Sequence, residues 1–141
     1  MACRHVEEMK KEGVTENHAI RVLKLLADIY ANLLKGGTAS PYSAGRVELW
    51  SLKARKFKNY KPYGKYVRVE HGTPSTTFAR MVLQLYKDNK LNQKEIDNLV
   101  NRYWKIAVIT LNEDKRLNEI GARSKMFKTP ELRWEEAGIL F

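Results

Sequence analysis

The chain has 141 residues, of which 43% are hydrophobic, and its formal net charge is +10 at pH 7. This length predicts a single domain over residues 1–141, and the apolar content excludes a disordered chain. The chain contains no apolar run near the roughly 18 residues that a membrane span needs, and its single cysteine excludes an intramolecular disulfide framework. We therefore expect a cytoplasmic protein with no membrane partner. The positive charge favours an anionic partner, most often nucleic acid, although charge can also serve solubility alone.

The first part of the chain is predicted to be helical. Residues 1–14 form either a short helix or a mobile arm that ends at Gly13. From Glu16 to Lys35, polar residues recur every three or four positions, and apolar residues cover the rest of the predicted helix. A helix that is apolar on most of its circumference belongs in the centre of a domain. Gly36 is expected to end it.

A second long helix is predicted from Pro41 to Lys58. Ser40 and Pro41 suit the cap and the first turn of such a helix. The apolar residues that follow have the spacing of one buried helical stripe: Val47, Trp50, Ala54 and Phe57.

Two short segments are predicted to be strands. Lys65–His71 alternates in polarity and is rich in β-forming residues. Lys105–Thr110 is short, apolar and β-branched, and this pattern also allows it to prolong the preceding helix. We favour the strand, because Thr110–Glu113 has the sequence of a capping box, and a capping box starts a new helix.

Four further helices are predicted, each with a capping or first-turn signal at its start. They run from Ser75 or Thr76 to about Asn89, from the capping box at Asn92–Glu95 to Tyr103, from Leu111 to Ile120, and from Glu131 to Ala137. The elements together predict a mainly helical α+β fold with about six helices and a two-stranded sheet in a ββα-like arrangement.

The most basic stretch lies between Glu48 and Glu70, where seven residues are basic and none is acidic. Aromatic residues are interleaved with the basic ones, and they include Trp50, Phe57 and Tyr66. Basic side chains neutralise phosphates, and aromatic faces stack on bases or sugars. We predict that the following residues bind DNA or RNA: Lys53, Arg55, Lys56, Lys58, Tyr60, Lys61, Tyr63, Lys65 and Arg68.

Two segments of the chain resemble motifs of the HNH, or His-Me finger, endonucleases. The first predicted strand ends in Glu70-His71-Gly72-Thr73-Pro74, which looks like the Glu-His-x-x-Pro variant of that family's first motif. The second predicted strand leads into Thr110–Leu117, which looks like the family's step from a strand into the helix that carries a further metal ligand. The resemblance covers about twenty residues.

This resemblance implies a metal-dependent endonuclease. His71 would be the general base that deprotonates a water for attack at phosphorus. Glu70 and Asp114 would hold one Mg²⁺-type ion, and Arg116 or Lys115 would steady the phosphate.

The chain also departs from the family's pattern. The helical position is usually histidine or asparagine, whereas the candidates here are Asp114, Glu113 and Asn118, and the insertion between the two motifs is long. Two other interpretations therefore stay open. One is a non-catalytic basic module that binds nucleic acid through the same residues. The other is a small inhibitor or adaptor, encoded by a mobile element, that binds a nucleic-acid-processing protein.

Overall fold

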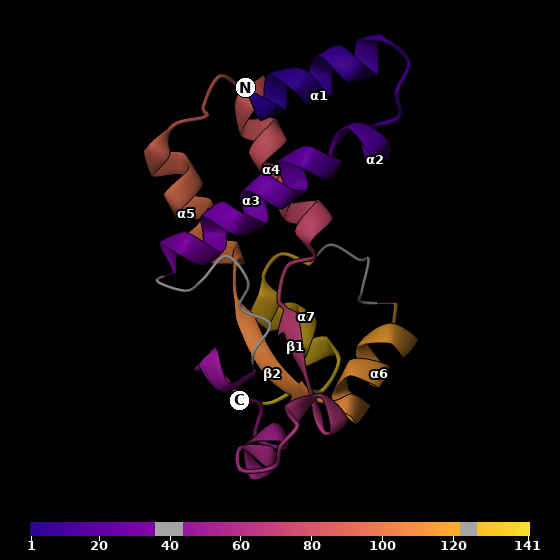
Figure 1. The fold of residues 1–141 in the computed structure, drawn as a ribbon, viewed down its shortest axis with the longest axis vertical. Coiled ribbons are helices and arrows are strands. Elements are labelled where there is room, and N and C mark those ends of the chain that lie inside the picture. The colour runs from indigo at the N-terminus through magenta and orange to yellow at the C-terminus, as the bar shows by residue number, and fades with distance from the viewer. Residues whose placement is uncertain (36–43, 122–126) are drawn as a thin grey trace.

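The structure, a computed structural model, describes residues 1–35, 44–121 and 127–141. Its helical part contains α1 (Ala2–Lys11), α2 (Glu16–Ala19), α3 (Arg21–Leu34), α4 (Ser75–Lys87) and α5 (Gln93–Tyr103). The other part is built on strands β1 (Val67–His71) and β2 (Ile106–Thr110), with α6 (Leu111–Glu119) and α7 (Pro130–Glu136) packed around them (Figure 1). The prediction of a mainly helical α+β fold is confirmed, with seven α-helices among the described residues. None of these helices is long and apolar enough to span a membrane.

The N-terminal segment is a packed helix rather than an arm. Cys3 and Val6 of α1 are buried, and they join residues of α3 and α4 in one hydrophobic cluster. The predicted helix from Glu16 to Lys35 is present, but it is divided into α2 and α3 at Ile20. Gly36, which was predicted to end this helix, lies outside the described residues.

Helix α3 does not lie at the centre of the domain, so that prediction is wrong. Within the part of the chain that the structure describes, α3 contacts α1, α2, α4 and α5, and two of its four buried residues are alanines, Ala27 and Ala31. Small residues let the neighbouring helices approach closely without enclosing the whole circumference. Five large apolar side chains of α3 are exposed: Val22, Leu25, Leu26, Leu33 and Leu34.

Both predicted strands are confirmed, and they pair in an antiparallel ladder that runs from Val67 opposite Thr110 to His71 opposite Ile106. Helices α4 and α5 are inserted between the strands in sequence. Alternate side chains of β2 face opposite sides. Ala107 packs in a cluster with residues of α6 and α7, whereas Val108 packs against Trp50.

The predicted helix from Pro41 to Lys58 is wrong within the described residues. Residues 44–58 contain only the short 3₁₀ turns η1 (Ala44–Arg46) and η2 (Ala54–Phe57). Between them the backbone runs parallel to β2: the N–H of Val108 donates to Leu49 O (2.8 Å), and the N–H of Ser51 donates to Val108 O (2.9 Å). Pairing with β2 satisfies backbone groups that a helix would have satisfied internally. Ser40 and Pro41, the predicted start, lie outside the described residues.

Gly72, directly after β1, marks the closest approach between the sheet and α7. A Cβ atom at this position would overlap the Cβ of Pro130 and would lie 2.9 Å from a ring carbon of Trp134. The N–H of Gly72 also donates to Lys105 O at 2.7 Å, so the backbone has little freedom to move away.

The substitution Gly72→Ala is expected to lower the free energy of unfolding by roughly 1–3 kcal/mol, because the added methyl group overpacks the contact with α7. Gly64→Ala is the matched control, since no atom lies within 4 Å of the Cβ that it would add. Urea denaturation of both variants measures the effect. Equal stabilities for the two variants would contradict this packing.

Candidate nucleic-acid interface

The aromatic residues of the basic stretch pack on one another. Phe57 and Tyr66 are stacked, with ring centroids 5.4 Å apart and an interplanar angle of 17°. Tyr60 meets both rings edge-on, at 5.8 and 5.6 Å. Trp50 and Tyr63 form a separate edge-on pair at 5.7 Å. These contacts hold an irregular loop in place where regular secondary structure is scarce.

Three lysines of this loop lie over aromatic rings. The Nζ atoms of Lys56, Lys58 and Lys61 are 5.0, 5.5 and 6.0 Å from the centroids of Phe57, Trp50 and Tyr63. Cation–π attraction of this kind positions an ammonium group and leaves it accessible to solvent, and all three lysines are exposed.

The two arginines of the stretch bond to the loop's own backbone. Arg55 donates from Nε to Trp50 O at 3.3 Å. Arg68 donates from Nη1 to Gly64 O at 2.6 Å and to Val67 O at 3.1 Å. Both guanidinium groups therefore help to fix the loop's conformation, and the lysines supply most of its accessible charge.

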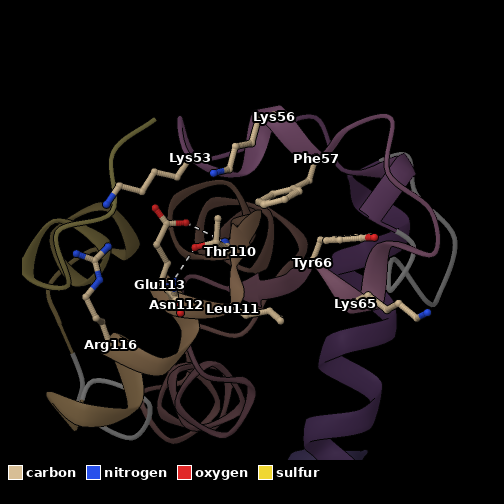
Figure 2. Close-up of a pocket in the computed structure, with 10 residues that line it drawn as sticks. All are labelled: Lys53, Lys56, Phe57, Lys65, Tyr66, Thr110, Leu111, Asn112, Glu113 and Arg116. Carbon is tan, nitrogen blue, oxygen red and sulfur yellow. Dashed lines mark hydrogen bonds between the residues drawn. The ribbon is translucent and has the colours of Figure 1, made fainter.

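A cavity of about 650 Å³ lies between this loop and the start of α6 (Figure 2). Its lining combines four cationic side chains, two aromatic rings and the first turn of α6: Lys53, Lys56, Lys65, Arg116, Phe57, Tyr66, Thr110, Leu111, Asn112 and Glu113. We call it the basic cavity. It brings together three of the predicted nucleic-acid-binding lysines. The other residues predicted for that role lie outside its lining: Arg55, Lys58, Tyr60, Lys61, Tyr63 and Arg68.

The wall formed by α6 is fixed by the predicted capping box, which is confirmed. Thr110 Oγ1 accepts from the N–H of Glu113 (3.1 Å), and the Glu113 carboxylate accepts from the N–H of Thr110 (2.8 Å). The same carboxylate accepts from the hydroxyl of Ser51 (2.7 Å), whose Oγ accepts from the N–H of Ala54 at the start of η2. This chain of hydrogen bonds joins α6 to the part of the basic stretch that precedes β1, which we call the basic loop. Sequence reasoning missed the part played by Ser51, because no local pattern links it to Glu113.

The first turn of α6 contributes positive potential to the basic cavity. The first backbone N–H groups of a helix have no acceptor within the helix, and Leu111 and Asn112, which carry two of them, line the cavity. The helix dipole adds partial positive charge at the same end. Glu113 is 1% exposed, and its carboxylate accepts two hydrogen bonds from neutral donors, so it offsets part of this potential.

Glu70, a predicted metal ligand, is engaged by a buried arginine. The guanidinium of Arg133 pairs with the Glu70 carboxylate and donates to His71 O at 3.2 Å. Arg133 is 2% exposed, and Glu70 is 9% exposed. A buried carboxylate needs such a partner, and the arginine competes with a metal ion for the same oxygen atoms.

His71, the predicted general base, is half-buried, with its ring centroid 5.1 Å from that of Trp104. Burial is the main cause that lowers the pKa of His71 from its ordinary value of 6.5, and the charges of Lys24 and Arg133 lower it further. The imidazole is therefore neutral at pH 7 and retains a nitrogen that can accept a proton.

The predicted catalytic residues are not gathered around the basic cavity. Of His71, Glu70, Asp114 and Arg116, only Arg116 lines it. In the ladder, His71 pairs with Ile106, four residue positions from the pair of Val67 with Thr110. This separation corresponds to about 13 Å along the strands. Across residues 1–35, 44–121 and 127–141, no group of three or more histidine, cysteine, aspartate or glutamate side chains could hold a metal ion. The metal site stays a prediction.

Comparison with models of protein families, with curated proteins and with solved structures found no match to this chain. The resemblance to HNH endonucleases therefore also stays a prediction.

The free energy of unfolding should decrease as the pH is lowered below the ordinary pKa of histidine. The folded state disfavours the charged imidazole of His71, so below about pH 6.5 the unfolded state binds a proton that the folded state does not. We expect the free energy of unfolding to decrease from pH 7.5 toward the lowered pKa, and we expect His71→Gln to flatten this decrease. Urea titrations between pH 5.5 and 7.5 measure it. His5→Gln, at an exposed position, is the control, and an identical pH profile for both variants would contradict the assignment.

Proposed function

We propose that this protein binds nucleic acid through the basic cavity. The proposal rests on one observation: Lys53, Lys56, Lys65 and Arg116 line a single cavity together with the N-terminus of α6. The other wall of the cavity is aromatic, formed by Phe57 and Tyr66. Cations and aromatic faces in one depression suit a polymer made of phosphates and bases.

The arrangement of charge favours this function over solubility alone. Charges that serve only solubility can spread over the surface, whereas Lys53, Lys56 and Arg116 gather at this cavity, and the buried Glu113 carboxylate offsets only part of their mutual repulsion (Figure 2). Among the described residues, neither Lys53 nor Lys65 forms an ion pair with a carboxylate. A bound phosphate would relieve the repulsion. We assign DNA or RNA as the partner and, from the single cysteine, the cytoplasm as the compartment.

The double variant Lys53→Gln/Lys56→Gln is expected to weaken oligonucleotide binding by at least tenfold, because two phosphate contacts are lost. The slope of log K against log salt should also become shallower by about one unit or more. Fluorescence anisotropy with a labelled oligonucleotide at several salt concentrations measures both effects.

The matched control is Lys90→Gln/Lys94→Gln, which removes the same charge from exposed positions in the helical part. Equal weakening by the two double variants would show that only net charge matters. No binding of any oligonucleotide by the wild-type protein would contradict the proposal and favour the interpretation as an adaptor for another protein.

Phosphodiester hydrolysis is a second candidate function. It is favoured by the order of β1, two helices, β2 and α6, and by the neutral imidazole of His71. In this proposal His71 accepts a proton from the attacking water. A Mg²⁺-type ion, when bound, would offset charge on the phosphate.

Hydrolysis predicts that a plasmid is nicked with Mg²⁺ or Mn²⁺, that chelator stops the nicking, and that His71→Ala abolishes it while oligonucleotide binding persists. Gel electrophoresis of the plasmid measures nicking, and circular dichroism confirms that the variant is folded. Nicking by His71→Ala at the wild-type rate would contradict the role of His71.

A further inference from the structure

We infer that the basic cavity holds one unpaired nucleotide, so that the protein prefers single-stranded to double-stranded nucleic acid. This inference rests on the proposed nucleic-acid binding and adds the class of substrate. It follows from three properties of the cavity: its size, the separation of its polar and apolar walls, and the contact between Lys56 and Phe57.

The size of the cavity selects for a nucleotide outside a stack. Its volume of about 650 Å³ is comparable to that of small-molecule sites, and its mouth is open to solvent. A base within a duplex is covered on both faces by its neighbours, so it can enter such a depression only after leaving the stack. A single strand presents unpaired bases, which makes their entry less costly.

The two sides of the cavity match the two ends of a nucleotide. Lys53 and Arg116 lie on one side, with the Glu113 carboxylate beside them, and Phe57 and Tyr66 lie on the other, where the side chain of Lys65 points away from Lys53 and Arg116 (Figure 2). Leu111 is 36% exposed at the cavity, so it adds apolar surface. The cationic side fits a phosphate, and the aromatic side fits the flat face of a base. A surface that bound only the phosphates of a duplex would not need the second side.

Lys56 can serve both sides. Its ammonium group lies 5.0 Å from the centroid of Phe57, and its side chain is exposed. An entering base can replace this ammonium group on the ring, and the freed Lys56 can then turn toward the phosphate. Stacking on Phe57 and pairing of Lys56 with the phosphate would therefore occur in the same binding event.

Three ligands of equal length test the inference by fluorescence anisotropy at one fixed salt concentration: a labelled thymidine strand of about twelve nucleotides, the corresponding blunt duplex, and an abasic strand with the same phosphates. We expect the thymidine strand to bind about tenfold more tightly than the other two. Equal affinity for all three ligands would overturn the inference and leave the proposed function standing. No binding of any ligand would overturn the proposed function itself.

The variant Phe57→Leu is expected to reduce binding of the thymidine strand toward that of the abasic strand and to leave abasic binding unchanged. Unchanged abasic binding also shows that the basic loop is still folded, because it requires the same lysines. Tyr86→Leu, which replaces a half-buried ring in α4, is the matched control. If Phe57→Leu weakens abasic binding, Tyr66→Leu is compared in the same way. If both variants still bind the thymidine strand more tightly than the abasic strand, the assignment of the aromatic wall is overturned.

Discussion

The buried carboxylate of Glu113 joins the segments on which the candidate interface depends. It accepts from the N–H of Thr110 at the end of β2 and from the hydroxyl of Ser51 beside the basic loop. A buried charge is costly unless it is hydrogen-bonded, so these donors must stay in place when the chain is folded. One side chain therefore fixes where α6 begins and where Lys53 and Lys56 lie relative to it.

A second buried carboxylate fastens the opposite end of the sheet in another way. Glu70 is paired with the guanidinium of Arg133, which also reaches His71 O. Glu113 is satisfied by neutral donors, whereas Glu70 uses a full positive charge from α7. A buried ion pair adds little net stability, but removing one of its members leaves an uncompensated charge. The pair thus holds α7 against the strand end, beside the close contact at Gly72.

The parts of the fold that sequence predicted were those with local signals. Both strands and the capping box at Thr110 follow from a few adjacent residues, and the structure contains them. The failures depend on contacts between distant segments. The pattern around Trp50 is helical, yet its backbone pairs with β2. Likewise, apolar residues along α3 do not indicate which of its faces a neighbour will cover.

The features of the candidate site also divide into those that local sequence predicts and those that depend on contacts between distant segments. The basic residues and the aromatic rings were visible in the sequence, because they lie within one stretch. Arg116 was assigned instead to a metal-dependent centre, since its place beside Lys53 depends on how the chain folds. The pairing of Glu70 with Arg133 also joins residues far apart in sequence, and no local pattern predicts it.

The cationic lining of the basic cavity is assembled only by folding, because Arg116 and Lys53 come from distant segments. A polyanion that bound only this assembled lining would favour the native state over the unfolded chain, and mass action would couple its concentration to the folding equilibrium. Without such a ligand, repulsion among the gathered charges opposes compaction most strongly in dilute salt. The midpoint temperature of unfolding therefore depends on the ions in solution as well as on the packing of the protein.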